Sequence, residues 1–150
     1  MANYDSIDLD WSWDGDFAID ITGDLKDTSS DFLLSLVNEI ATIVKSESLE
    51  WEKDITLGGN LGDFQGQPNV AAVGAAIEDR VSSSLVNQNI IQPGDVSVKV
   101  LPVHANQVLI MIRVAAEATS RNGLVPGEPV KINLVYDTSE NSVFFLNHGV

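Results

Sequence analysis

The sequence predicts an α+β fold: two amphipathic helices packed on a mostly antiparallel β-sheet and preceded by an acidic N-terminal β-hairpin. Three observations predict it. Residues 31–45 and 68–87 repeat apolar side chains at helical spacing. Residues 7–13 and 16–21 alternate large apolar side chains with mostly acidic ones, which is the period of a half-buried strand. After residue 95, short apolar stretches alternate with turn residues, as in antiparallel hairpins.

The N-terminal hairpin is expected over residues 6–22. Its first strand places Ile7, Leu9, Trp11 and Trp13 on one side and carboxylates on the other. Asp14-Gly15 suits a two-residue turn because both residues tolerate positive φ angles. Residues 17–21 then alternate again, and Gly23-Asp24 ends the hairpin.

The two helices each have a polar start and an apolar stripe. The first, over residues 31–45, follows the N-cap candidates of residues 27–30. The second, over residues 68–87, has Pro68 in its first turn and alanines that make one side smooth. The predicted stripes are Leu33, Leu36, Val37, Ile40, Ile43 and Val44 in the first helix, and Val70, Val73, Ile77, Val81 and Leu85 in the second.

Residues 46–67, hereafter the connector, join the helices. The segment contains Trp51, Leu57, Leu61 and Phe64, and is too apolar for a solvated loop. A connection of about 20 residues without regular structure is often functional. Its glycine-rich part, residues 58–62, lacks the Lys-Ser/Thr pair of a phosphate-binding loop, so we interpret it as tight turns beside packed leucines.

The remaining strands are expected at residues 96–100, 108–116, 130–136 and 143–146, with a turn at residues 104–107 and a longer loop around Asn122-Gly123. At 150 residues the chain has the size of one domain. We divide it into the acidic hairpin (1–24), a core (25–116) and a C-terminal hairpin (117–150).

Composition excludes several functions. The formal net charge is −14, and residues 1–54 hold 14 Asp and Glu against 3 Lys. Such a surface repels phosphate backbones and anionic lipid, so we expect no nucleic-acid partner and no membrane association. No cysteine is present for a disulfide or a thiolate site, and no apolar run of about 18 residues exists to span a membrane. The start of the sequence does not resemble a signal peptide.

Candidate chemistry is sparse. Asp10, Ser12 and Asp14 resemble the start of a calcium loop, but Ile21 stands where that loop needs its closing Glu. The carboxylates after the first helix, Glu47, Glu50, Glu52 and Asp54, would suit glycoside hydrolysis only as a pair across a cleft, and such clusters are more often solvated. The histidines, His104 and His148, have no nucleophile motif beside them. We therefore expect no enzyme activity, no catalytic or metal-binding residue and no cofactor.

The order of motifs resembles the small baseplate wedge proteins of contractile phage tails, in particular their Mu-like branch, and the related subunits of type VI secretion baseplates. The matching pieces are Phe17-Ala-Ile-Asp-Ile, the helix from Asp31, Trp51-Glu-Lys-Asp54, Gly58-Gly-Asn-Leu-Gly62, Asn69 and the strands at residues 96–100 and 108–114. The resemblance covers most of residues 16–116, on short and degenerate motifs.

One motif departs from part of that family. T4-like and secretion-system members carry Glu-Pro-Arg after the second helix, where this chain has Gln92-Pro93-Gly94. The similar triplet Glu128-Pro129-Val130 lies elsewhere. A wedge contact made through that arginine is therefore not expected here, in keeping with the Mu-like branch.

The resemblance implies a structural subunit that joins the baseplate to the tail sheath and initiates sheath assembly. Its partners would be other wedge proteins, sheath subunits and the central hub and tube, with six copies per baseplate in a virion assembled in the bacterial cytoplasm. A sheet edge would accept a strand from the sheath. The predicted interface residues are Trp51, Leu57, Gly59, Leu61, Asn69, Val143, Phe144 and Phe145. Two alternatives remain: a peptidoglycan-degrading, lysozyme-like hydrolase of the tail, and a free-standing acidic domain that binds a small ligand.

Overall fold

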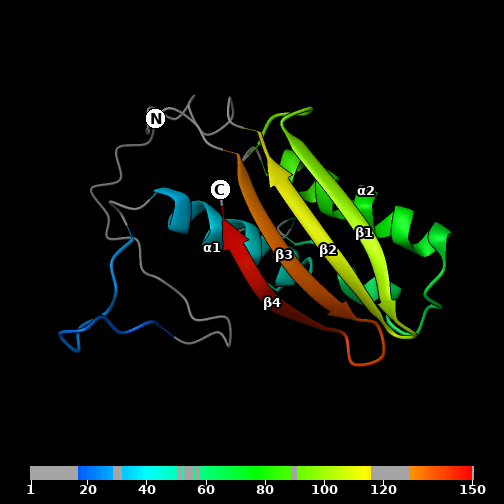
Figure 1. Cartoon of the computed structure of the whole chain (residues 1–150), viewed down its shortest axis with the longest axis horizontal. Coiled ribbons are helices and arrows are strands. Elements are labelled where there is room, and N and C mark those ends of the chain that lie inside the picture. The colour runs from blue at the N-terminus through cyan, green and yellow to red at the C-terminus, as the bar shows by residue number, and fades with distance from the viewer. Residues whose placement is uncertain are drawn as a thin grey trace. The chain divides into compact units, whose positions relative to one another are not determined.

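A computed structural model of the chain confirms the predicted α+β class (Figure 1). It describes residues 17–28, 32–50, 52, 56, 58–88, 91–115 and 129–149. The elements in order are α1 (Phe32–Lys45), the 3-10 helix η1 (Leu61–Phe64), α2 (Ala71–Asn87), β1 (Val96–His104), β2 (Gln107–Val114), β3 (Val130–Asp137) and β4 (Ser142–Gly149). No helix in these ranges is long and apolar enough to cross a membrane.

The chain divides into two compact units, residues 1–41 and 42–150, with the division inside α1. The expectation of one domain stays a prediction. In the first unit, residues 6–16 of the predicted hairpin, including the calcium-like residues Asp10, Ser12 and Asp14, lie outside the described residues. The helical stripe of α1 is confirmed for Leu36, Val37 and Ile40, which are all buried.

Residues 17–25 of the first unit form a tight turn, hereafter the acidic turn. An isolated antiparallel bridge joins Ile19 to Leu25, where we expected a continuous strand over residues 17–21. The Asp20 carboxylate closes the turn by accepting hydrogen bonds from the Thr22 backbone N–H (2.7 Å) and hydroxyl (2.6 Å). The Thr22 bonds lower the pKa of Asp20, because they favour the charged carboxylate.

The second unit is built on a sheet of order β1-β2-β3-β4, with every neighbouring pair antiparallel. Because side chains alternate along a strand, every second residue of the central strands β2 and β3 points into the core. The buried residues are Val108, Ile110, Ile112 and Val114 of β2, and Val130, Ile132, Leu134 and Tyr136 of β3. The register places the core-facing residues of neighbouring strands side by side: Ile110 of β2, for example, pairs with Val100 of β1 and with Leu134 of β3.

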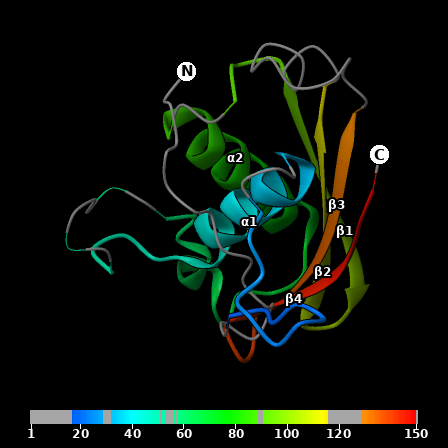
Figure 2. The same cartoon turned by 90° about the vertical axis from the view of Figure 1, so that its left-hand side faces the viewer.

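Helix α2 covers β1 on this core side of the sheet, as Figure 2 shows. Its buried stripe is Val73, Ile77, Val81 and Leu85, as predicted. At Gly74 the helix passes so close that an added Cβ would lie 3.7 Å from Val100 Cγ1. We call the side of the sheet that faces away from α2 the open face.

The strand β1 is a protected edge. The backbone N–H of Val100 donates to Glu78 Oε1 of α2 at 2.9 Å, so this edge donor is already used. Pro102 has no N–H to offer, and a register shift follows it between Pro102 and His104. Side-chain capping, proline and irregular register are all devices that discourage strand addition at a sheet edge.

The turn between β3 and β4 is held by Asp137. Its carboxylate accepts hydrogen bonds from the Ser139 hydroxyl and backbone N–H and from the Gln107 side chain. The Ser139 hydroxyl, followed by the Gln107 side chain, lowers the pKa of Asp137 to about 2. The carboxylate is therefore ionised and internally paired at neutral pH.

The predicted start of α2 is wrong by three residues. The helix begins at Ala71, and Val70 is its N-cap in an extended conformation (φ −117°, ψ 160°). Val70 is 49% exposed and so does not belong to the buried stripe. Pro68 lies before the helix and not in its first turn.

We expect Val70→Ser to stabilise the protein by about 0.5–1 kcal/mol, because the Val70 side chain makes no cap hydrogen bond and serine can accept one from the first turn. The measurement is the free energy of unfolding in urea. Val70→Ala is the matched control, since alanine removes the same side chain without adding an acceptor. Equal stability of the two variants would contradict the assignment of residue 70 as the cap.

Candidate functional site

The connector closes the C-terminal end of α1. The last carbonyls of a helix lack partners within it. Here Gly59 N–H donates to Ile43 O at 2.7 Å, and Ser46 satisfies Thr42 O through both its N–H (3.0 Å) and its hydroxyl (2.6 Å). The segment after the helix thus folds back against the end of that helix, which explains why an irregular stretch holds a defined path.

The glycines of the connector are required by this close approach. A Cβ on Gly58 would lie 2.7 Å from Ser46 O and from Glu47 C, and its φ of +150° disfavours any side chain. A Cβ on Gly59 would lie 2.9 Å from Val44 O. Gly59, predicted as an interface residue, is buried against backbone.

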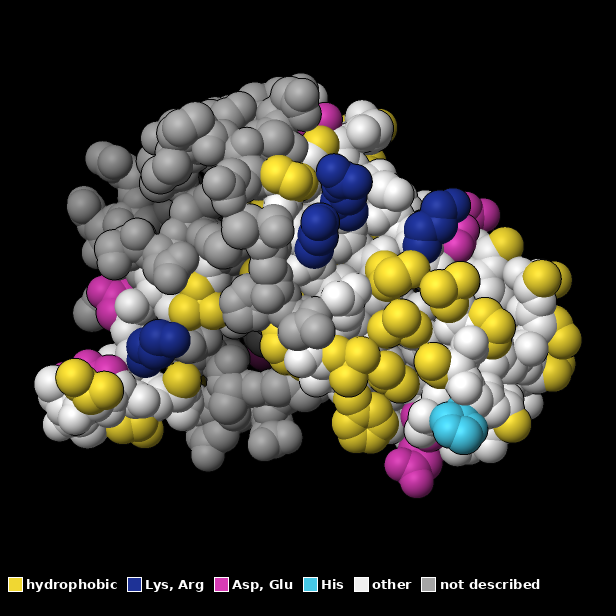
Figure 3. Space-filling view, viewed as in Figure 1, with side chains coloured by type: hydrophobic (Ala, Val, Ile, Leu, Met, Phe, Trp, Pro, Cys, Tyr) yellow, Lys and Arg dark blue, Asp and Glu magenta, His cyan; other side chains and the backbone are white. Residues whose placement is uncertain are grey.

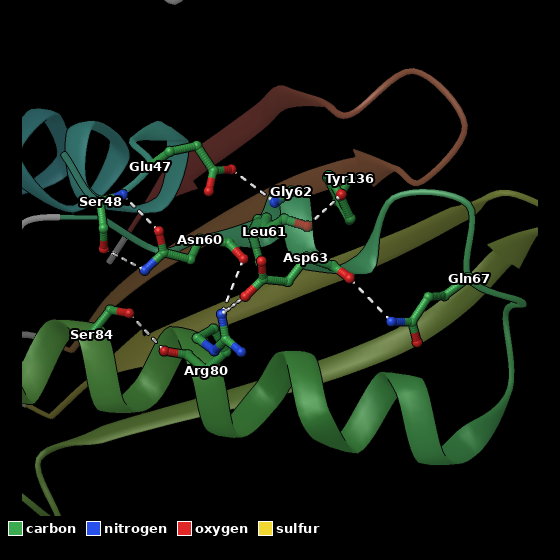
Figure 4. A network of polar contacts seen from close by, with 10 residues as sticks. All are labelled: Glu47, Ser48, Asn60, Leu61, Gly62, Asp63, Gln67, Arg80, Ser84 and Tyr136. Carbon is green, nitrogen blue, oxygen red and sulfur yellow. Dashed lines mark hydrogen bonds and ion pairs between the residues drawn. The ribbon is translucent and has the colours of Figure 1, made fainter. Parts of the chain in front are cut away.

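Asn60 and Glu47 clasp the two ends of the connector together (Figure 4). Asn60 adopts the left-handed conformation (φ 49°, ψ 41°) and bonds Ser48 twice, accepting from its N–H (2.6 Å) and donating to its hydroxyl (2.8 Å). Glu47 Oε1 accepts the N–H of Gly62 at 2.8 Å. An added Cβ at Gly62 would lie 2.8 Å from the same oxygen. The carboxylate and glycine therefore form one fitted contact.

Helix α2 braces the connector from its other side (Figure 4). Arg80 Nη1 donates to Asn60 O at 3.2 Å and to Asp63 Oδ2 at 2.7 Å. Its guanidinium carbon also lies 5.4 Å from the centre of the Phe64 ring. Asp63 is largely exposed, so this ion pair contributes on the order of 0–1 kcal/mol, and the bond to the backbone carbonyl is what positions the connector.

Tyr136 ties the connector to the sheet. Its side chain is fully buried, and its hydroxyl donates to Leu61 O at 2.6 Å, with Asn141 Oδ1 a second acceptor at 3.0 Å. Burial raises the pKa of Tyr136 to about 12, and the charges of Glu47, Asp137 and Asp63 act in the same direction. Leu61, predicted as an interface residue, is 2% exposed, so its side chain belongs to the core.

Asn69, another predicted interface residue, joins the start of α2 to the hairpin of β1 and β2. Its amide Nδ2 donates to His104 O at 2.6 Å and to Gln107 O at 3.2 Å. Its amide group thus has a structural role within the chain. His104 is the last residue of β1 and not a turn residue.

The last three predicted interface residues lie on β4, which is an outer strand of the sheet in the described part of the chain. Val143 and Phe145 pair with Tyr136 and Leu134, whose side chains are in the core. Phe144 points to the other side, onto the open face, and is 46% exposed. The strand therefore contributes to both sides of the sheet. Trp51 and Leu57 lie outside the described residues.

Four acids of the connector suggested a hydrolase. In the described part of the chain, no contact brings two of their carboxylates together. Glu47 binds Gly62, Glu50 Oε2 accepts the N–H of Glu47 at 2.8 Å, and Glu52 is exposed. Asp54 lies outside the described residues, as does the side chain of His148. The described residues contain no group of three or more His, Cys, Asp or Glu that could hold a metal ion.

Comparisons with protein-family models, with curated proteins and with solved structures each found no match for this chain. The interpretation of the connector and of β4 therefore rests on the geometry above and on the motif resemblance.

Sequence reasoning missed three residues that organise this region: Glu47, Arg80 and Tyr136. Glu47 looked like one of a set of solvated acids, and Arg80 and Tyr136 come from elements far along the chain. Each acts on a backbone group of the connector. The sequence does place Tyr136 in a predicted strand, and the hydroxyl of a buried tyrosine needs a hydrogen-bond partner. The local sequence does not identify that partner.

We expect Gly58→Ala to lower the free energy of unfolding by about 2 kcal/mol or more, because its Cβ would meet backbone atoms at 2.7 Å. Gly74→Ala is the matched control. It makes only an ordinary contact at 3.7 Å inside α2, so it should stabilise by about 0.5–1 kcal/mol. Urea unfolding measures both, and effects of the same sign would contradict the described path of the connector.

Tyr136 gives a prediction at alkaline pH. The folded pKa of about 12 exceeds the reference value of 10, so the folded state keeps its proton longer than the unfolded chain does. The resulting contribution of Tyr136 to the free energy of unfolding is fully present below pH 10, and about 2–3 kcal/mol of it is lost as the pH rises to 12. Tyr136→Phe should remove this slope and cost about 1–3 kcal/mol at pH 7, since Leu61 O loses its donor.

The measurement is urea unfolding of both proteins between pH 8 and pH 11.5. Ultraviolet titration of phenolate supplies the control, because the chain has two tyrosines, Tyr4 and Tyr136, and the variant retains the first. Identical pH slopes in the two proteins would contradict the buried phenol.

Proposed function

We propose that this chain is a structural assembly subunit of a contractile phage tail baseplate, the wedge component that joins the baseplate to the sheath and initiates sheath assembly. The observation that carries the proposal is the position of β4, an outer strand of the described sheet on which Phe144 and Leu146 are exposed. Both outer strands have a register shift, but at β1 the Val100 donor is also used by Glu78, and Pro102 has no donor. A sheath strand would add at β4.

The connector supports this role. The side chains of Glu47 and Asn60 are bonded to the backbone N–H groups of Gly62 and Ser48, and the glycines of the connector allow close backbone packing. Such a segment presents a defined shape to a partner, which lowers the conformational entropy that binding would otherwise cost. The motif resemblance of residues 16–116 to the wedge family names the kind of partner: sheath, wedge and tube subunits around a sixfold baseplate.

The test is co-expression with the sheath protein of the same genome, followed by co-purification and electron microscopy of sheath assembly. We expect a complex with the wild-type chain, and its loss in Leu146→Lys, because a lysine on an edge strand opposes strand addition. Val103→Lys is the matched control, since it places the same charge at an exposed position of β1.

Trp51→Ala should also abolish the complex if the connector meets a partner. A genome without a sheath gene, or a wild-type chain that joins neither sheath nor wedge proteins, would contradict the proposed function. Equal loss in the Leu146 and Val103 variants would contradict the β4 edge as the site of strand addition.

A further inference from the structure

The open face of the sheet is unusually apolar for a surface. Residues directly opposite each other in antiparallel strands share a face. One such row crosses all four strands: Leu101 pairs with Leu109, Leu109 with Val135, and Val135 with Phe144. On this side Leu101 and Phe144 are exposed, and Leu109, Met111 and Val135 are half-buried. Val103 and Leu146 are also exposed and lie at the register shifts of β1 and β4. Contiguous exposed apolar patches mark interaction sites.

One end of the open face is basic. Arg113 pairs with Lys131 across β2 and β3, and Lys99 stands in the next row; all three are exposed. Figure 3 shows hydrophobic side chains gathered over the strands, with Lys and Arg side chains along one side of them. In a chain with 22 acids and 8 bases this is a local reversal of charge. Asp95, just before β1, lies at the same end.

The acidic turn has the complementary character. Its large apolar side chains Phe17, Ile19, Ile21 and Leu25 are all exposed. Between them lie the carboxylates of Asp20 and Asp24, and Asp16 precedes them in the sequence. The hydrogen bonds of Asp20 hold the turn in one shape, so its apolar side chains are presented without further ordering.

We propose that the open face of the sheet binds the acidic turn of a second copy of this chain. The apolar row across the strands would cover Ile19 and Ile21, and the long stems of Lys99, Arg113 and Lys131 would raise their charges to the level of the turn's carboxylates. Both sets have exposed apolar side chains, and a second copy of the chain carries the complement of each. This inference does not depend on the proposed baseplate function.

The contact would be heterologous, because the turn of one copy meets the face of the next. Such contacts produce rings when the rotation closes and filaments when it does not. The full chain should therefore self-associate with increasing concentration, and salt should weaken the association because exposed charges at the basic end are screened.

The first experiment is sedimentation velocity of the full chain from about 1 μM to about 500 μM, a range that detects dissociation constants of transient interfaces. We expect Ile19→Ser/Ile21→Ser and Leu101→Ser/Phe144→Ser each to weaken association by about tenfold or more. Leu49→Asn/Val70→Ser is the matched control and should leave association unchanged. It removes two exposed apolar side chains elsewhere, and Asn tolerates the positive φ of residue 49.

Mixing the two association-deficient variants is the decisive step. The turn variant keeps an intact face and the face variant keeps an intact turn, so the mixture should form a heterodimer with wild-type affinity. A mixture that stays monomeric would overturn the proposal. So would a wild-type chain that is monomeric throughout the range, or association that survives the turn variant.

Substitutions of charged residues test the proposal independently. Arg113→Gln/Lys131→Gln should weaken association by about tenfold, as expected for two charge pairs at an interface. Ala76→Glu/Ser83→Glu, at exposed positions of α2, changes the net charge by the same amount and should have little effect. Equal effects of both variants would mean that general repulsion is being measured, and would overturn the role of the basic end.

Discussion

The hydrogen bond from the Tyr136 hydroxyl to the Leu61 carbonyl is the constraint on which the centre of the second unit depends. The connector has little regular structure, so its backbone groups must find partners elsewhere or lose free energy on burial. Tyr136 supplies one partner from β3, Arg80 supplies one from α2, and the end of α1 supplies Ile43 O. Three elements thus meet at one short segment, and the segment in turn sets the distances between them.

The glycines of the connector follow from the same constraint. Packing backbone directly on backbone leaves no room for a Cβ at Gly58 or Gly59, and the Glu47 carboxylate occupies the space beside Gly62. This closely fitted segment holds the end of α1, helix α2 and strand β3 in place around it.

The register of the sheet brings three basic residues of the chain together, and most of the acids lie elsewhere in the sequence. Fourteen of the 22 acids precede residue 55, whereas Lys99, Arg113 and Lys131 stand together on the open face. Exposed single charges contribute little to stability. When acidic and basic groups are separated within one chain, they favour one orientation as copies or partners meet, because like-charged surfaces repel.

The sequence by itself determined the elements of this fold. Apolar spacing predicted α1, the buried stripe of α2 from Val73 onward and all four strands, because these patterns are local. Only the tertiary structure decided what the elements do together. The start of α2 moved to Ala71, and Glu47, Arg80 and Tyr136 found partners 15, 20 and 75 residues away along the chain. The open face arises where Leu101, Leu109, Val135 and Phe144 align across four strands. Register depends on long-range pairing, which no single stretch of sequence encodes.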